Sequence, residues 1–487
     1  MICVSIAQTS RRLALADMLN AATMGADLLE VRLDTFEHEP DPKELLSARR
    51  KPVIFSCRRK EDGGSWRGSE DARIVLLKTA IIAQPDYCEL EYDVADQIRR
   101  FGPCQRVISY TNLKETPKNI AEIYEEAKKK DPDIIKLTCR ARTPEEAWPL
   151  VQILAKSTVP TVVVGLGRPG LMLTILGRKI GAPFALAALE LGLEAYPGQP
   201  TISELERVYD YRNIHRQTPL LGVTGLGTWS TSMAAVLNRA FQQLSQPTRC
   251  LPLQVGNVRL FRKIIEAVKL VGVVVDAENQ ETLRDVAGEV DGSVGDASVD
   301  LLVQDQAKQW VGIHTLGPAA GAALESEMQL AGRPLQQAMV VIAGVTPIAR
   351  GVARDLAKRG AKLIFASADR NEAARMCQAV GGRQIQPEAI YTTLHDAVVV
   401  SREKSDPAFE RPALQSNYLR PGMVVLDLTD LGTETDFVRD ARLRGARVVS
   451  GKRFVLEHAI SVVERLTGKK MTRDALESEC DGLFEEE

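Results

Sequence analysis

The sequence predicts an α/β protein that begins with a closed parallel (β/α)8 TIM barrel and continues as a second, open α/β unit. Three observations support this prediction. At 487 residues the chain is too long for a single core. Short apolar runs alternate with polar, helix-periodic stretches through the first two hundred residues. A different strand–helix alternation, typical of an open parallel sheet, begins near residue 220.

Eight apolar runs account for the barrel strands, and the stretches between them supply its helices. The helix-periodic stretches include residues 119–130 and 143–155. A turn at 197–200, a last helix from about residue 202 and a linker at 213–219 would close the barrel. The eight runs are residues 2–6, 27–32, 52–57, 86–91, 106–110, 133–138, 161–164 and 184–188.

The second half opens with a strand at 220–225 and contains one clear βαβ unit. That unit consists of a strand at 339–344, a helix at 348–359 and a strand at 362–367. Further strands follow at 397–400, 424–428 and 446–450, and a helix at 455–466 is expected to pack back on the sheet. The predicted domains are therefore 1–215, 218–332, 333–455 and 456–487.

Composition excludes several classes of protein. A net charge of −2 offers no field for nucleic acid or an anionic membrane. The start of the chain lacks a signal-peptide pattern, and no uncharged apolar run could span a bilayer. Eight cysteines without a Cys-x-x-Cys pair predict reduced thiols and a cytoplasmic location. The five isolated histidines predict no metal site.

Lys136 is the most informative residue because it interrupts the apolar run 133–138. Strand alternation directs Lys136 to the same side as Ile134 and Thr138. Burial lowers the pKa of an amine, and a neutral lysine can attack a ketone to form a Schiff base. The alternative is a lysine near a strand end that reaches water or pairs with a carboxylate.

Charged residues also end the neighbouring predicted strands. Glu30 and Arg32 share one face at the end of the second strand, and Arg58 follows the third strand. Such pairs are often structural ion pairs at a barrel mouth. Together with Lys136 they predict a cationic pocket for a small ketone that bears a carboxylate.

These motifs resemble those of type I 3-dehydroquinate dehydratases. That family dehydrates 3-dehydroquinate through a lysine imine without a cofactor, so the resemblance implies that Lys136 is the imine-forming residue. It also implies substrate-pocket roles for Glu30, Arg32, Arg58 and Gln199. The matching segments are Glu30 to Asp34, Arg58 with Gly63 and Gly64, Ser109 to Asn112 with Thr116 and Pro117, Ile135 with Lys136, and Pro197 to Gln199.

The sequence departs from the family at catalytic positions. Thr111 occupies the position of the general-base histidine, and a hydroxyl cannot accept a proton at neutral pH. Asp62 occupies the position of the family's glutamate before the paired glycines, and the neighbouring Glu61 is the alternative for that role. Leu173 and Thr174 replace a Ser-Arg pair that clamps a carboxylate, and a serine is replaced around Ala195 and Tyr196.

The second half resembles shikimate dehydrogenase, which occurs fused to the dehydratase in other proteins. The match rests on Gly222 to Gly225, the serines Ser230 and Ser232, Gly272 with Val273, the 339–344 strand and Gly451. It implies that Ser230 and Ser232 bind a substrate carboxylate, and that Gly344 and Arg370 contact NADP.

Here too the chemistry is altered. Gln280 occupies the position of the family's catalytic lysine, and Leu316 that of its catalytic aspartate. The phosphate loop keeps one glycine, Gly344, so its backbone approaches a pyrophosphate less closely. Hydride transfer with NADP is therefore doubtful. His314, His395 and His458 are interpreted as structural.

Three hypotheses remain open for this shikimate-pathway-type protein. The first is a dehydratase fused to an impaired dehydrogenase-like half. The second is a Schiff-base lyase that acts on another keto acid. The third is a pseudoenzyme that keeps both folds for ligand binding, scaffolding or regulation. All three predict a keto-acid or shikimate-type ligand and no nucleic-acid or membrane partner. All three also allow a homo-oligomer.

Overall fold

The computed structural model describes residues 1–292, 294–402, 414–431, 434–480 and 483. Contacts within the chain define two compact units. The first comprises Met1–Pro219 and Leu251–Val268, and the second comprises Leu220–Cys250 and Lys269–Glu487. Part of the predicted 456–487 domain falls at positions 481–482 and 484–487, outside the described residues.

The first unit contains the predicted eight-stranded parallel barrel. It is nearly closed, since the two outermost strands of its sheet are not paired with each other in the described part of the chain. Its sheet has the order β7-β6-β5-β4-β3-β2-β1-β8, and each neighbouring pair is parallel. Each strand starts and ends within two residues of its prediction. The strands are β1 (Ile2–Ile6), β2 (Leu28–Arg32), β3 (Val53–Ser56), β4 (Tyr87–Glu91), β5 (Gln105–Asn112), β6 (Ile134–Arg140), β7 (Thr161–Leu166) and β8 (Ala185–Ala187).

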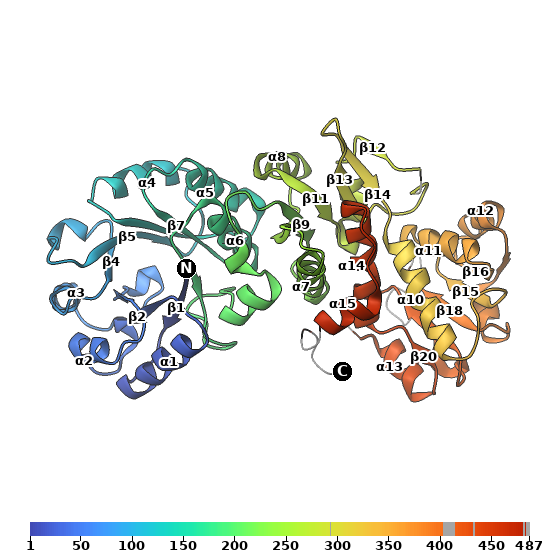
Figure 1. Cartoon of the computed structure of the whole chain (residues 1–487), viewed down its shortest axis with the longest axis horizontal. Coiled ribbons are helices and arrows are strands. Elements are labelled where there is room, and N and C mark those ends of the chain that lie inside the picture. Colours follow the sequence, from blue (N-terminus) through green and yellow to red (C-terminus); the bar gives the residue numbers. More distant parts are fainter. Residues whose placement is uncertain (293, 403–413, 432–433, 481–482, 484–487) are drawn as a thin grey trace. The chain divides into compact units, whose positions relative to one another are not determined.

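Helices surround the barrel strands (Figure 1). The side chains of Ser10, Ser69 and Thr143 each accept a hydrogen bond from a first-turn amide, which satisfies a donor that the helix itself leaves unpaired. The helix predicted from residue 202 is a short π-helical turn, Glu204–Val208. The helices are α1 (Arg11–Thr23), α2 (Pro42–Ser47), α3 (Glu70–Ile82), α4 (Ile120–Lys128), α5 (Pro144–Lys156) and α6 (Leu171–Ile180). Residues Leu251–Val268 of this unit include α8 (Val258–Val268).

The barrel interior changes from apolar to polar along the strands. One level is a buried apolar cluster that includes Cys3, Leu28, Ile54, Val107 and Ile134. Alternate residues of a strand share a face, so the next inward side chains lie two positions further on. These are polar and almost completely buried: Ser5, Glu30, Ser56, Glu89, Ser109 and Lys136. The polar level lies toward the carboxyl ends of the strands, where barrel enzymes hold their active sites.

The second unit contains two sheets. One is mixed, with the order β10-β9-β11-β13-β14-β12. The pairs β9–β11 and β12–β14 are parallel, whereas β11–β13 and β13–β14 are antiparallel. Its strands are β9 (Leu220–Thr224), β10 (Arg249–Leu253), β11 (Leu270–Val274), β12 (Glu289–Val290), β13 (Leu301–Gln304) and β14 (Trp310–Ile313). The last three residues of β10 are assigned to the first unit.

The other sheet is parallel and Rossmann-like. Its order, β17-β16-β15-β18-β19-β20, reverses between β15 and β18. This confirms the open α/β prediction for the second half. The strands are β15 (Met339–Ala343), β16 (Lys362–Ala366), β17 (Arg383–Ile385), β18 (Ala397–Val400), β19 (Val424–Asp427) and β20 (Arg447–Val448).

The long helix near the C-terminus packs back on the second unit, as predicted. Phe454 of α14 belongs to the same buried cluster as Val340 and Ile342 of β15. None of the helices in the described ranges combines the length and apolar character needed to cross a bilayer. The helices of this unit are α7 (Thr228–Gln243), α9 (Gln280–Arg284), α10 (Leu316–Leu330), α11 (Pro347–Lys358), α12 (Arg370–Val380), α13 (Asp436–Leu443), α14 (Gly451–Thr467) and α15 (Arg473–Glu479).

Candidate active site

Lys136 lies inside the barrel and is only 1% exposed. Its Nζ forms an ion pair with Oε2 of Glu89 and lies 3.7 Å from Oε1 of Glu30. Both carboxylates are buried, so this interaction is screened little by solvent. Lys136 is therefore paired inside the fold rather than extended to water.

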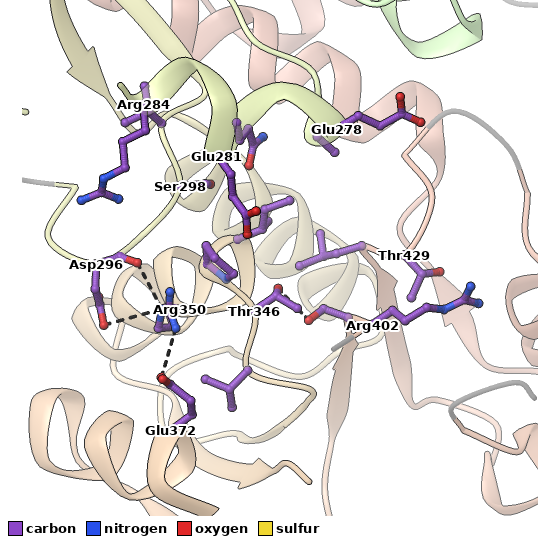
Figure 2. Close-up of a pocket in the computed structure, with 18 of the residues that line it drawn as sticks. Glu278, Glu281, Arg284, Asp296, Ser298, Thr346, Arg350, Glu372, Arg402 and Thr429 are labelled. Carbon is purple, nitrogen blue, oxygen red and sulfur yellow. Dashed lines mark hydrogen bonds and ion pairs between the residues drawn. The ribbon is translucent and has the colours of Figure 1, made fainter. Parts of the chain in front are cut away.

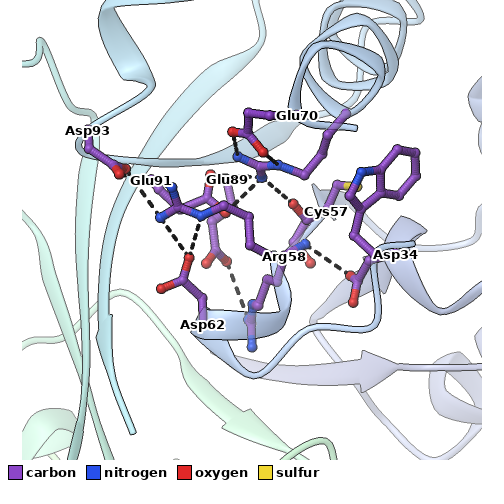
Figure 3. A network of polar contacts seen from close by, with 12 residues as sticks. Asp34, Cys57, Arg58, Asp62, Glu70, Glu89, Glu91 and Asp93 are labelled. Carbon is purple, nitrogen blue, oxygen red and sulfur yellow. Dashed lines mark hydrogen bonds and ion pairs between the residues drawn. The ribbon is translucent and has the colours of Figure 1, made fainter. Parts of the chain in front are cut away.

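Arg58 completes a cluster of two cations and two carboxylates. Its Nη2 binds Oε1 of Glu30 and lies 3.5 Å from Oε2 of Glu89. Figure 3 shows Arg58 and Glu89 side by side. Ser5 and Ser56 also donate hydrogen bonds to Glu30, at 2.8 and 3.1 Å. Burial alone would raise the pKa of Glu30, but the charges of Arg58 and Lys136 hold that pKa well below its ordinary value.

A cavity of about 330 Å³ opens next to this cluster. Lys136 is not one of its lining residues, but Thr138, two positions further along the same face of β6, is. Three arginines and one aspartate give the lining a positive charge, in keeping with the predicted cationic pocket. The lining residues are Arg58, Asp62, Gly63, Thr111, Leu113, Thr138, Arg140, Arg142, Val164, Leu166, Gly167, Leu186, Ala195, Tyr196 and Pro197.

Thr111 and Asp62, the two residues at altered family positions, both line this cavity. Thr111 is opposite Thr138 in the β5–β6 register. Asp62 is held at 2.7 Å by Arg59, which also binds Asp93 at 2.9 Å (Figure 3). Burial raises the pKa of Asp62. The structure thus brings Thr111 and Asp62 together with Arg58, while Lys136 lies one inward position deeper.

Arg32 and Gln199, both expected in the substrate pocket, do not line the cavity. Arg32 forms a buried bidentate pair with Asp34, with contacts of 2.9 and 2.6 Å. Asp34 also accepts the backbone N–H of Arg58 at 3.1 Å. Gln199 donates to the hydroxyl of Ser5 at 3.2 Å and accepts from a loop amide at 2.7 Å. Arg32 thus binds the carboxylate that accepts the Arg58 amide, and Gln199 binds the serine that donates to Glu30.

Glu89 was not predicted from the sequence as a site residue. Like Lys136, it interrupts a buried apolar strand, here β4 (Tyr87–Glu91). That charge within an apolar run was the signal that could have identified it. Tyr196, which lines the cavity, was considered only as a departure from the family pattern.

The second unit has a larger cavity of about 470 Å³, shown in Figure 2. It lies beyond the carboxyl ends of β15 and β18, where the order of the parallel strands reverses. Its lining comprises Ala277, Glu278, Gln280, Glu281, Arg284, Asp296, Ser298, Val299, Val345, Thr346, Pro347, Ile348, Arg350, Asp369, Glu372, Ser401, Arg402, Leu428 and Thr429. Five carboxylates and three arginines give this lining a negative balance.

Some of the expected dehydrogenase positions do not line this cavity. Gln280 lines it, and its buried Nε2 has no hydrogen-bond partner within the described residues. Leu316 is fully buried and does not line the cavity. Arg370 is also absent from the lining and donates to Gln386 at 3.1 Å. Gly344 has a φ of +89°, and a Cβ there would collide with the carbonyl oxygen of Ser401. Gly344 therefore permits close packing of two strand ends.

A Rossmann lobe binds a pyrophosphate at the start of the helix that corresponds to α11. Here the polar groups at this helix start are engaged in contacts within the protein. Pro347 has no N–H to offer, and the hydroxyl of Thr346 accepts from the amide of Ala349 at 3.3 Å. Arg350 donates to the backbone oxygen of Asp296 at 3.1 Å and to Glu372 at 3.0 Å (Figure 2). These residues do not suit a dinucleotide phosphate.

Ser230 and Ser232 do not line the cavity either. The hydroxyl of Ser230 donates to the backbone oxygen of Thr224 at 2.8 Å, and the side chain is largely buried. Ser232 is half-buried on the same helix, α7. Their role in carboxylate binding stays a prediction.

His314 and His458 have polar partners inside the second unit. His314 Nδ1 lies 2.8 Å from Oδ2 of the buried Asp300. Asp300 in turn accepts the amides of Thr315 and Leu316, at 2.7 and 3.0 Å, at the start of α10. His458 Nε2 is 3.0 Å from the hydroxyl of Thr315. Within the described ranges, no group of three His, Cys, Asp or Glu side chains is arranged to hold a metal ion.

Comparisons with known proteins agree with these two units. Residues 2–216 match the family model of type I 3-dehydroquinase. The chain is 25% identical over 496 residues to the chloroplastic bifunctional 3-dehydroquinate dehydratase/shikimate dehydrogenase of Arabidopsis thaliana, covering 96% of this chain and 82% of that protein. It is 29% identical over 198 residues to the 3-dehydroquinate dehydratase of Methanopyrus kandleri, covering 39% of this chain and 90% of that protein.

Two solved structures are also similar. The dehydroquinate dehydratase and shikimate dehydrogenase from S. pombe AroM is 16% identical, with a TM-score of 0.42, and the match covers 98% of this chain and 97% of that one. Shikimate dehydrogenase from Aquifex aeolicus is 19% identical, with a TM-score of 0.45, over 55% of this chain and 98% of that one. The chain therefore contains a type I 3-dehydroquinase-like barrel at residues 2–216 and, as a whole, resembles the bifunctional 3-dehydroquinate dehydratase/shikimate dehydrogenases.

Proposed function

We propose that the barrel is a Schiff-base lyase of the 3-dehydroquinate dehydratase type, with Lys136 as the imine-forming residue. One observation carries the proposal: the Lys136 amine is buried inside the barrel, one inward position below the cavity-lining Thr138. Arg58 links the amine to the cavity, because it lines the cavity and shares Glu89 with Lys136. A keto acid in this cavity would lie close to both a nucleophile and a guanidinium group.

The cavity lining suits the ligand chemistry. Arg58 and Arg140 supply positive charge for a substrate carboxylate, and guanidinium groups bind carboxylates with good geometry. Val164 and Leu186 provide an apolar wall for the carbon skeleton. Thr111 cannot act as a base, so we expect slow dehydration of 3-dehydroquinate, and a different keto acid remains the alternative substrate.

Reductive trapping tests this proposal. The full chain would be treated with borohydride in the presence of 3-dehydroquinate and, in parallel, of pyruvate, then digested and analysed by mass spectrometry. We expect a stable adduct on Lys136 and none in a Lys136→Met control. If neither ketone, nor any other small keto acid, gives an adduct on Lys136, the lyase proposal is wrong.

We also propose that the second unit binds a small molecule without transferring hydride. The supporting observation is the cavity wall, where Gln280 presents an unpaired buried amide and Asp296 and Glu372 neutralise Arg350. An amide cannot exchange a proton with an alcohol as a catalytic lysine does. We expect no oxidation of shikimate with NAD or NADP, measured by absorbance of the reduced cofactor. Robust turnover would contradict this. A cytoplasmic location and a homo-oligomer stay predictions.

A further inference from the structure

We propose that Glu89 is the acid–base residue of the barrel site: its carboxylate takes a proton from Lys136 Nζ and returns it while the imine forms. This inference rests on the proposed lyase function and deepens it. It names an acid–base group for imine formation in a site where Thr111 stands at the position of the histidine of the related dehydratases.

The geometry favours Glu89 over the other acids. Glu89 Oε2 is in direct ion-pair contact with Lys136 Nζ, whereas the nearest oxygen of Glu30 is 3.7 Å away. Asp62 is bound to Arg59 at the cavity wall. A proton can therefore pass between Lys136 and Glu89 without an intervening group.

Glu30 and Glu89 also differ in the number of donors that they accept. Glu30 receives hydrogen bonds from Ser5, Ser56 and Arg58, which fix it as an anion, and its pKa is held well below the ordinary value. Within the described residues, the side chain of Glu89 contacts only Lys136 and Arg58, both through Oε2. Glu89 therefore has fewer polar partners than Glu30, and Lys136 is one of the two.

Proton transfer inside this cluster creates no net buried charge. Before transfer, the charges of Lys136 and Arg58 balance those of Glu30 and Glu89. After transfer, Lys136 and Glu89 are neutral, and the Arg58–Glu30 pair remains. Because an unpaired buried charge is costly, a neutral cluster in both states keeps the free amine accessible.

The chemical step balances as follows. Glu89 takes one proton from the Lys136 ammonium, and the resulting amine attacks the ketone carbon, breaking the carbon–oxygen π bond. A second amine proton moves to the oxygen, giving a neutral carbinolamine. Glu89 then donates its proton to the hydroxyl group, the carbon–oxygen bond breaks, and water leaves a protonated imine on Lys136. The carboxylate is regenerated.

The test is the pH dependence of borohydride trapping with 3-dehydroquinate in the full chain. We expect Glu89→Gln to be trapped about 10²–10⁴-fold more slowly than the wild type near neutral pH. Its rate should rise with pH, because without Glu89 the amine must lose its proton to solvent base. The wild type should show a much weaker pH dependence.

A matched control is Glu91→Gln, the same substitution on the same strand. Glu91 pairs with Arg73 at 2.8 Å rather than with Lys136, so this variant should keep the wild-type pH profile. Trapping of Glu89→Gln at the wild-type rate and profile would overturn the inference. Absence of an adduct in the wild type with any keto acid would instead remove the lyase function, and the inference with it.

Glu89→Asp decides the matter if Glu89→Gln loses its circular dichroism signal. The shorter side chain withdraws the carboxylate from the amine but keeps an internal base. We expect slower trapping, by about tenfold or more, with the weak pH dependence of the wild type. An unchanged rate would contradict a role for Glu89 in proton transfer.

Discussion

Thr111 lies opposite Thr138 across the β5–β6 ladder, one inward position beyond the facing pair Ser109 and Lys136. Both threonines line the cavity of the barrel. A side chain at position 111 is therefore held above the level of the amine, on the strand next to it. This is the position where a base could reach a ligand bound to Lys136.

Thr111→His should increase the rate of 3-dehydroquinate dehydration by about 10²-fold or more, because an imidazole can accept the proton that a hydroxyl cannot. The gain should fall away below the ordinary histidine pKa of about 6.5, where the imidazole is protonated. Product formation can be followed by ultraviolet absorbance across this pH range. Thr138→His, in the same cavity on the next strand, is the control and should give no comparable gain. A folded Thr111→His variant without a gain would show that position 111 does not reach the substrate.

Lys136→Met should prevent trapping and also destabilise the barrel. Removal of the ammonium leaves Glu89 without its ion-pair partner, at an expected cost of about 3–5 kcal/mol in the free energy of unfolding. The double variant Lys136→Met with Glu89→Gln should recover part of this loss, since the unpaired charge is removed as well. Chemical denaturation of all four proteins measures the coupling. Additive effects of the two substitutions would contradict the buried pair.

Asp300→Asn should destabilise the second unit by about 3–5 kcal/mol near neutral pH, because Asp300 pairs with His314 and caps α10. Burial alone would raise the pKa of Asp300, but the charge of His314 holds it well below its ordinary value. Its contribution is therefore present above about pH 4 and is lost as pH falls toward the folded-state pKa.

Denaturation of wild type and Asp300→Asn from neutral to acidic pH measures this dependence. The difference in unfolding free energy should be largest above pH 4 and should narrow below it. Asp305→Asn, in an exposed turn, is the control and should change stability by less than about 0.5 kcal/mol. A difference that stays constant with pH would mean that Asp300 is not held as an anion.

The sequence was sufficient to predict what depends on local pattern. The strand around Lys136 and the face that this residue shares with Thr138 follow from alternation within one run. The partner of Lys136 could not be predicted in this way, because Glu89 is 47 residues away and meets the amine only once β4, β5 and β6 are in register.

Some residues that were expected to bind a ligand have other partners in the structure. Arg32 was expected in the substrate pocket, but Asp34, two residues further on, binds it in the folded barrel. Gly344 was considered a remnant of a phosphate loop. In the structure it allows the chain to pass close to Ser401, a residue 57 positions away. The Gly344–Ser401 approach could not be predicted from a motif, because it joins distant parts of the chain.

Neither NAD nor NADP at millimolar concentration should raise the unfolding temperature of the second unit. A ligand at 100 times its Kd would stabilise the folded state by about 2.7 kcal/mol, so binding in the micromolar range would be visible.

Asp296 and Glu372 hold Arg350 at the start of α11 and add negative charge to the cavity. Asp296→Asn with Glu372→Gln should free this guanidinium and improve NADP affinity by at least about tenfold, because like charges that repel the phosphates are removed. Glu278→Gln, in the same cavity lining and without a contact to Arg350 among the described residues, is the control and should improve NADP affinity less. A clear thermal shift of the wild type with either nucleotide would show that the cavity accepts a dinucleotide as it stands.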